Sequence, residues 1–262
     1  MSLEDKWEFI SVSTLNEIRS LLSEVNENAV IFLDVDDTLI TPRSKLFRSK
    51  SPYRSLIDDI KSNRETIADF ETLLSRWRLQ RQTELVSKEW GDLIGELKKK
   101  FPLYALTKME TGPLGEIPSM EEWRYKELRE KGVELTPLYD GKEEDVLLAS
   151  PGKPYKATFY KGIFSTGSYR KGELIRQYLL RESPGELVLI DDRQEQLQDV
   201  HEACSDLSIP FSGICFRGES LIPGAPDLTI AEFQKNHLLN HHEWLEDEVA
   251  REKINRNGNK IE

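Results

Sequence analysis

The chain has 262 residues, of which 38% are hydrophobic, and it carries a formal net charge of −11 at pH 7. This length suits one large domain or a core domain with a smaller insertion, and no apolar run is long enough to span a bilayer. The charge argues against binding to nucleic acid or to an anionic membrane, because both carry the same sign as the protein. The only cysteines, Cys204 and Cys215, indicate no disulfide framework and are interpreted as small core residues.

The first ten residues, "MSLEDKWEFI", contain no cationic start followed by an apolar stretch, so no signal peptide is visible. We therefore expect a cytoplasmic protein. The alternative is an exported protein from which a signal has been removed.

The first part of the chain predicts a helix, a buried strand and an insertion. A helix is expected over 13–25, where Thr14 and Glu17 form a capping box. The continuous apolar run over 29–35 is typical of a strand covered on both faces. Residues 41–100 are charged and rich in helix formers, and they predict a helical insertion.

The second part of the chain alternates strands with helices. The helix expected at 119–132 has Ser119 and Glu122 as its capping box and Gly132 as its stop. The other expected elements are strands over 101–109, 185–192 and 211–218, helices over 170–180 and 195–207, and a hairpin within 145–165. This alternation predicts an α/β protein with an open parallel sheet.

Polar residues end three of the expected strands. Asp34 and Asp36 follow the first strand, Thr107 ends the second, and Asp191 and Asp192 end the third. Ligands of open α/β sheets bind at the carboxyl ends of the strands, so these side chains are expected to meet there.

Crowded carboxylates need a cation, a proton or water, because they repel one another and resist burial. A site with oxygen ligands alone suits a hard cation, most simply Mg²⁺. The alternative for "DVDDT" (34–38) is an aspartate-rich turn, since aspartate is common where strands end.

Four motifs in chain order resemble those of the haloacid dehalogenase (HAD) superfamily. "DVDDT" (34–38) is similar to its first motif, Thr107 to the second, Lys171 at the start of a helix to the third, and Asp191 with Asp192 to the fourth. The resemblance covers roughly residues 29–218. It implies a Rossmann-like α/β core with an inserted cap.

The resemblance implies that Asp34 is a nucleophile that forms an aspartyl-phosphate. Asp36 would protonate the leaving group and then deprotonate the attacking water. Dehalogenases of the superfamily lack this second aspartate, so its presence favours phosphoester hydrolysis. Mg²⁺ would lie between Asp34, the backbone carbonyl of Asp36 and Asp192, with Asp191 behind it; the roles of Asp191 and Asp192 could also be exchanged.

The other motif residues would manage charge and position. Thr107 would donate its hydroxyl to a phosphoryl oxygen, and Lys171 would supply a cation to the nucleophile and the phosphate. Asp37 is interpreted as structural, and Thr38 is expected to hydrogen-bond within the bend of the first motif.

The expected domains are a core formed by 1–40 and 101–235, a helical cap formed by 41–100, and a C-terminal helix with a frayed tail over 236–262. The cap position is that of the superfamily's first cap type, and caps of this kind select the substrate. Candidate ligand contacts, each also explained by packing or solvation, are Trp77, Trp90, Trp123, Arg43 and Arg193.

Three histidines near the C-terminus, His237, His241 and His242, are spaced for one helix face. We interpret them as part of a solvated helix rather than as a metal site, because no acidic third ligand is identifiable.

The sequence therefore predicts a Mg²⁺-dependent phosphomonoester hydrolase that acts on a small phosphorylated substrate or on a phosphoprotein. The alternatives are a phosphomutase-like phosphoryl transferase, a protein phosphatase and a non-catalytic HAD-like binding protein. No feature of the sequence indicates an oligomeric state.

Overall fold

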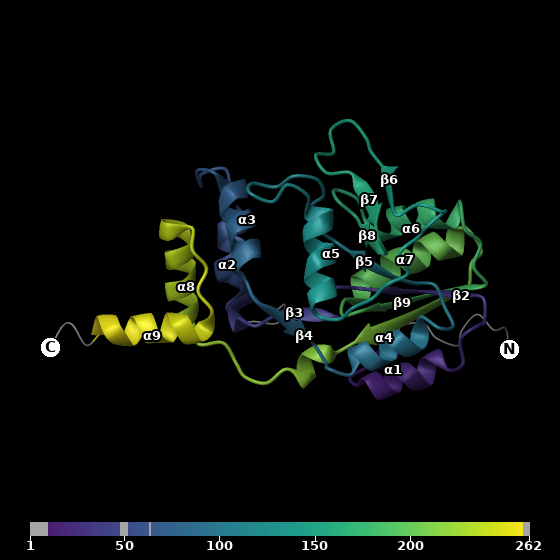
Figure 1. Ribbon diagram of the computed structural model, residues 1–262, viewed down its shortest axis with the longest axis horizontal. Coiled ribbons are helices and arrows are strands. Elements are labelled where there is room, and N and C mark those ends of the chain that lie inside the picture. The colour runs from purple at the N-terminus through teal and green to yellow at the C-terminus, as the bar shows by residue number, and fades with distance from the viewer. Residues whose placement is uncertain (1–9, 48–51, 63, 259–262) are drawn as a thin grey trace. The chain divides into compact units, whose positions relative to one another are not determined.

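A computed structural model describes residues 10–47, 52–62 and 64–258 (Figure 1). It separates two compact units. The sheet unit comprises the described residues up to Ile40 together with 85–112 and 119–222, and the helical unit comprises those in 41–84, 113–118 and 223–262.

The sheet unit is built on an eight-stranded, mostly parallel sheet with the order β1-β10-β9-β2-β5-β8-β7-β6. Neighbours from β1 to β8 are parallel, and β7 and β6 add an antiparallel edge. The strands are β1 (Ile10–Val12), β2 (Ala29–Leu33), β5 (Leu103–Thr107), β6 (Glu144–Leu148), β7 (Ala157–Tyr160), β8 (Ile163–Ser165), β9 (Glu186–Asp191) and β10 (Phe211–Phe216). The α/β class with a largely parallel sheet is confirmed.

Helices cover both faces of this sheet (Figure 1). The first core cluster joins one face to α1 (Leu15–Leu22), α4 (Trp90–Leu97) and α5 (Met120–Glu130). The second cluster joins the other face to α6 (Lys171–Leu179) and α7 (Gln194–Asp206). Every residue of β2 and β5 is buried, as expected for strands covered on both sides.

The helix caps follow the sequence signals in part. Thr14 and Glu17 form the predicted capping box at α1. Ser119 accepts a hydrogen bond from the backbone N–H of Glu122 at the start of α5, at 3.1 Å. The Glu122 carboxylate pairs with Lys126, at 2.9 Å, and this pairing replaces the expected reciprocal bond to the cap.

The hairpin expected within 145–165 is present as β6 and β7, and a third strand, β8, follows it. β8 pairs with β7 on one side and with β5 on the other, so it is a strand of the parallel sheet. β1 was not predicted, because three residues are too few to give a periodic signal.

The division into units differs from the predicted domains at residues 85–100. They contain α4, whose buried residues Trp90, Leu93 and Ile94 belong to the first core cluster of the sheet unit. Helical periodicity predicts a helix here, but it does not identify the surface against which the helix packs.

The helical unit has its own apolar core, which includes Leu46, Leu73 and Trp244. Its helices are η2 (Lys45–Phe47), α2 (Arg54–Ser62), α3 (Phe70–Gln80), α8 (Leu228–His241) and α9 (Asp247–Gly258). Two short strands, β3 (Ile40–Pro42) and β4 (Thr83–Leu85), pair at the two ends of the segment 41–84, which was expected to be helical throughout.

The C-terminal segment also differs from the prediction of one helix and a frayed tail over 236–262. Residues 223–262 are grouped with the helical unit, and α9 continues to Gly258. The last four residues, 259–262, lie outside the described part of the chain. Within the part described, no helix has both the length and the apolar character needed to cross a membrane.

Candidate active site

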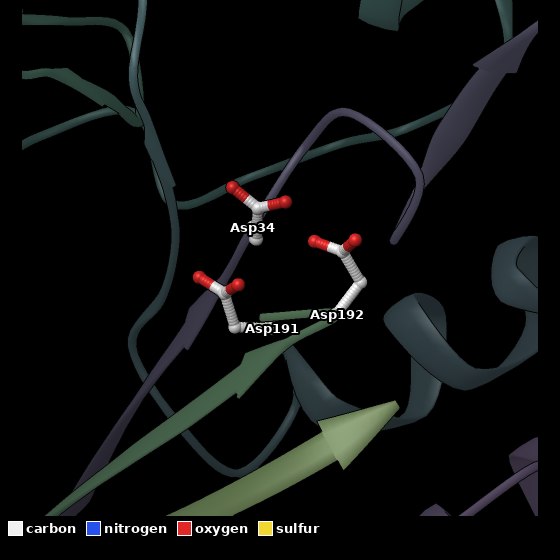
Figure 2. Close-up of side chains that lie close together, drawn as sticks. All are labelled: Asp34, Asp191 and Asp192. Carbon is white, nitrogen blue, oxygen red and sulfur yellow. The ribbon is translucent and has the colours of Figure 1, made fainter. Parts of the chain in front are cut away.

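The carboxylates of Asp34, Asp191 and Asp192 gather at the carboxyl edge of the parallel sheet. Asp34 follows β2 and Asp191 ends β9, and the register that pairs Leu33 with Ile190 brings these two ends together. The backbone N–H of Asp34 donates to the Ile190 carbonyl at 2.8 Å. One carboxylate oxygen from each of the three aspartates lies within 4.8 Å of the others (Figure 2).

Lys171, the first residue of α6, bridges two of these carboxylates. Its Nζ lies 2.6 Å from Oδ1 of Asp34 and 2.6 Å from Oδ2 of Asp191. Only 2% of the Lys171 side chain is exposed. The start of α6 is fixed on α7, because the backbone N–H of Gly172 donates to Oδ2 of Asp199 at 2.8 Å.

Burial and mutual repulsion perturb the acidity of the cluster. Burial raises the pKa of Asp34 well above its ordinary value; the Lys171 ammonium opposes this shift, and Asp191 and Asp192 add to it. Burial, followed by the charges of Asp191 and Asp37, raises the pKa of Asp192 to about 7. For Lys171, burial disfavours the ammonium form, but the carboxylates of Asp191 and Asp34 outweigh it and raise the pKa.

The cluster has the composition of a site for a hard divalent cation. The three carboxylates and the Lys171 ammonium together carry two net negative charges when all are ionised. Both carboxylate oxygens of Asp191 already have protein partners, because Lys171 donates to Oδ2 and the backbone N–H of Arg193 donates to Oδ1 at 2.9 Å. Asp34 and Asp192 are therefore better suited than Asp191 to bind Mg²⁺ directly.

Asp36 does not join the acidic cluster. The chain turns sharply after Val35, whose carbonyl accepts from the N–H groups of Leu39 and Ile40, both at 3.0 Å. Asp37 takes a left-handed conformation at the turn, with φ of 65°. The Asp36 carboxylate then pairs with Arg124, at 3.2 and 2.9 Å from the two terminal nitrogens.

Thr38 departs from its predicted role. Its hydroxyl is buried and has no hydrogen-bond partner in the part of the chain described, so it does not hold the bend. The backbone carbonyl of Thr38 accepts instead from the indole N–H of Trp90, at 2.9 Å. Trp90 is fully buried and packs edge-on against Phe216, so it is a core residue rather than a ligand contact.

Thr107 ends β5 at the same edge of the sheet and is 1% exposed. Its strand partner is Ser165 of β8, and its carbonyl accepts from the N–H of Thr166 at 3.0 Å. The hydroxyls of Ser165 and Thr166 are buried without a hydrogen-bond partner among the described residues. The sequence contains a signal for Ser165 and Thr166, because they follow the apolar residues of β8 just as Asp34, Thr107 and Asp191 follow or end the apolar runs of their strands.

Arg124 is the residue of this region that sequence reasoning missed. It lies in α5, within "MEEWRYKELRE", where most charged side chains are expected to be solvated. Only 3% of its side chain is exposed. Neither composition nor spacing distinguishes this arginine from Arg129 on the same helix, because its burial depends on packing against a bend far away in the sequence.

The other predicted contacts have protein partners of their own. Arg193 is exposed and pairs with Glu195 at 3.0 Å, and Arg43 donates to Gln82 at 2.8 Å in the helical unit. The guanidinium of Arg124 lies 5.0 Å from the ring of Trp123. Trp77 packs against the core of the helical unit.

The C-terminal histidines form no metal cluster in the described part of the chain. His237 pairs with Glu243 at 2.6 Å, and its ring centroid lies 4.5 Å from that of His241. His242 ends α8 in a left-handed conformation, with φ of 53°. Among the described residues, the acidic cluster at the sheet edge is the only group of three metal-binding side chains close enough to share an ion.

The fold and the site together define an α/β protein with an acidic cluster and a buried lysine at the carboxyl edge of its sheet. Residues 11–251 match the family described as "Protein of unknown function (DUF2608)", and the chain belongs to this family. The chain is also similar to "Uncharacterized protein RP296" of Rickettsia prowazekii (strain Madrid E). The two are 30% identical over 242 residues, which cover 91% of this chain and 88% of the relative. No solved structure matches the chain.

Proposed function

We propose that the protein is a Mg²⁺-dependent phosphomonoester hydrolase of the HAD type that acts through an aspartyl-phosphate at Asp34. The observation that carries this proposal is the position of Lys171, whose ammonium lies 2.6 Å from the Asp34 carboxylate inside a cluster with Asp191 and Asp192. A buried carboxylate at the end of a strand, beside a fixed cation, is suited to attack an electrophile that carries negative charge.

In the first step, a carboxylate oxygen of Asp34 attacks phosphorus, and the bond between phosphorus and the leaving oxygen breaks. The leaving oxygen takes a proton from Asp36. In the second step, water attacks the phosphorus of the acyl phosphate and returns a proton to Asp36, which releases phosphate and regenerates the Asp34 carboxylate. Lys171 stabilises charge on the nucleophile and on the phosphoryl oxygens throughout.

The acidic cluster supports a bound Mg²⁺, which would be held by Asp34 and Asp192 and oriented by Asp191. The ion supplies positive charge that neutralises the phosphoryl oxygens. Buried hydroxyls at the same sheet edge fit an anionic ligand rich in acceptor oxygens. Thr107 ends β5, and the hydroxyls of Ser165 and Thr166 have no hydrogen-bond partner among the described residues.

We assign the helical unit the role of the substrate-selecting cap. Its segment 41–84 is inserted between Asp36 and Thr107, which is the position of the first cap type of the superfamily. Residues 223–262 enlarge this unit from the C-terminal side. The substrate class that fits the site is a small phosphate monoester.

The test is hydrolysis of p-nitrophenyl phosphate by the full chain, measured with Mg²⁺ and with EDTA, beside Asp34→Asn. We expect turnover that needs Mg²⁺ and that falls by at least about 10³-fold in the variant, because Asp34 is the proposed acceptor of the phosphoryl group and an amide is a poor nucleophile. Asp92→Asn, which alters an exposed aspartate of α4, is the matched control and should keep wild-type turnover.

A second measurement tests the intermediate. Brief incubation with labelled substrate followed by acid quenching should trap a phosphoryl group on the chain, in a bond that hydroxylamine cleaves. Labelling of Asp34→Asn equal to that of the wild type would contradict the proposal. Transfer of the label to an added alcohol rather than to water would favour a phosphoryl transferase.

A further inference from the structure

Asp36 and Arg124 form an ion pair that joins an exposed side chain to a buried one. The Asp36 side chain is 42% exposed, whereas Arg124 is 3% exposed. Both terminal nitrogens of Arg124 donate to Asp36, at 3.2 Å to Oδ1 and 2.9 Å to Oδ2. This fork of two bonds fixes the plane of the carboxylate as well as its position, which a single bond would not do.

Arg124 is itself held by a second carboxylate, that of Glu127. One terminal nitrogen also donates to Oε2 of Glu127, at 2.7 Å, and the Glu127 side chain is 10% exposed. The helix that carries both residues is anchored by Met120 and Leu128, which are buried. The guanidinium is therefore a fixed point, and Asp36, on the bend after β2, is the partner whose orientation it restricts.

We propose that Arg124 is a positioning residue that holds the Asp36 carboxylate in the orientation needed to exchange a proton with the leaving group and then with water. This inference rests on the proposed function. Both carboxylate oxygens of Asp36 accept from one planar guanidinium, so the plane of the carboxylate follows that of Arg124. Without the fork, an exposed aspartate on a bend would sample several rotamers, and proton transfer would need the correct one.

A purely structural ion pair and a positioning residue predict different kinetics. Loss of a structural pair lowers turnover of every ester by the same factor. Loss of a positioning residue for Asp36 lowers the rate of phosphoryl transfer to Asp34 in proportion to how much the leaving group needs a proton. Phenyl phosphate releases phenol, whose pKa is about 10 as in tyrosine, and p-nitrophenyl phosphate releases a much more acidic phenol that leaves without a proton.

The experiment compares kcat/KM for these two esters in the wild type, Arg124→Ala and Arg124→Lys, each saturated with Mg²⁺. This ratio reports the steps up to formation of the aspartyl-phosphate and not its later hydrolysis, which is common to both esters. For Arg124→Ala we expect a loss of about 100-fold on phenyl phosphate and of less than about 5-fold on p-nitrophenyl phosphate. Arg124→Lys keeps the charge but not the fork, and it should give a smaller loss with the same selectivity. Arg129→Ala, on the exposed face of α5, is the matched control and should leave both values unchanged.

A double-mutant cycle tests whether Arg124 acts through Asp36. Asp36→Asn should show the same selectivity for the better leaving group. Adding Arg124→Ala to Asp36→Asn should then change the ratio of the two kcat/KM values by less than about 2-fold, since no proton-exchanging carboxylate remains to be positioned.

Equal losses on both esters in folded Arg124→Ala, or a gain in turnover, would overturn the inference while leaving the phosphatase intact. If neither Arg124→Ala nor Arg124→Lys folds, Asp36→Asn, which keeps the arginine, decides the question: equal losses on both esters would show that Asp36 gives no proton to the leaving group and would overturn the inference. Failure of the proposed function is recognised separately, since the wild type would then hydrolyse neither ester.

Discussion

At the scale of single residues, the Lys171 ammonium partly neutralises the negative charge of the acidic cluster. Its ammonium lies between Asp34 and Asp191 with almost no access to water. Removing one partner of a buried ion pair leaves an uncompensated charge in a medium of low dielectric constant. Here two carboxylates would lose their partner together.

We therefore expect Lys171→Met to lower the free energy of unfolding of the metal-free protein by about 3–5 kcal/mol, measured by urea denaturation in EDTA. Mg²⁺ should restore part of this loss, because the ion replaces the missing positive charge. The control is Lys126→Met: Lys126 is 66% exposed and pairs with Glu122 on α5, so this change should have little effect on stability. A similar cost for both variants would contradict the role assigned to Lys171.

Asp192 makes stability depend on pH in a direction that can be checked. Burial raises its pKa from 3.8 to about 7, so between these values the folded chain holds a proton that the unfolded chain has released. The stabilisation is complete below the ordinary aspartate pKa and is lost as the pH rises through about 7. In EDTA, the free energy of unfolding should therefore fall from pH 5 to pH 8.

Mg²⁺ should reverse this fall in the free energy of unfolding. The ion binds the ionised carboxylate, so the affinity of the site for Mg²⁺ rises as Asp192 loses its proton. Asp192→Asn should remove much of the decline seen in EDTA. The measurement is a set of denaturation curves at pH 5 to 8 for both proteins, with and without Mg²⁺. Identical pH dependence in the wild type and the variant would show that Asp192 does not titrate in this range.

At the scale of elements, the contact between α6 and α7 sets the position of Lys171. A side chain at Gly172 would meet the backbone oxygen of Asp199 in α7, so these helices approach closely only because residue 172 is glycine. Gly172→Ala should lower the free energy of unfolding by about 1–3 kcal/mol and reduce turnover, because α6 must shift together with its first residue. Gly95→Ala is the control: position 95 is exposed in α4 with open space around it, so this change should stabilise the protein by about 0.5–1 kcal/mol. The measurement is the melting temperature of each variant. The prediction fails if Gly172→Ala melts at or above the temperature of Gly95→Ala.

The elements also show how far the sequence predicts the structure. The continuous apolar runs of β2 and β9 identify buried strands, and the polar residues that follow identify the edge where Asp34 meets Asp191. The prediction was weaker where the decisive contact is remote in sequence. A short alternating segment does not reveal that β8 completes the parallel sheet, and the sequence of α5 does not reveal that Arg124 turns inward to Asp36. Local periodicity reports which face of an element is apolar, and it does not report what that face will meet.

At the scale of the whole molecule, the chain forms two units with separate apolar cores. The first and second core clusters lie in the sheet unit, and the cluster that includes Leu73 and Trp244 lies in the helical unit. A unit with its own core can open without the other, since its stability comes from its own packing. The acidic cluster belongs entirely to the sheet unit.

Binding of Mg²⁺ should therefore stabilise one unit selectively. A ligand present at 100 times its dissociation constant stabilises the state that binds it by about 2.7 kcal/mol. In hydrogen exchange followed by mass spectrometry, peptides from β2, β9 and α6 should exchange more slowly when Mg²⁺ is added, whereas peptides from α8 and α9 should keep their rates. Asp34→Asn should abolish the change, because it removes a ligand without altering the helical unit. Equal slowing in α8 and α9 would mean that the two units open together, and it would contradict their independence.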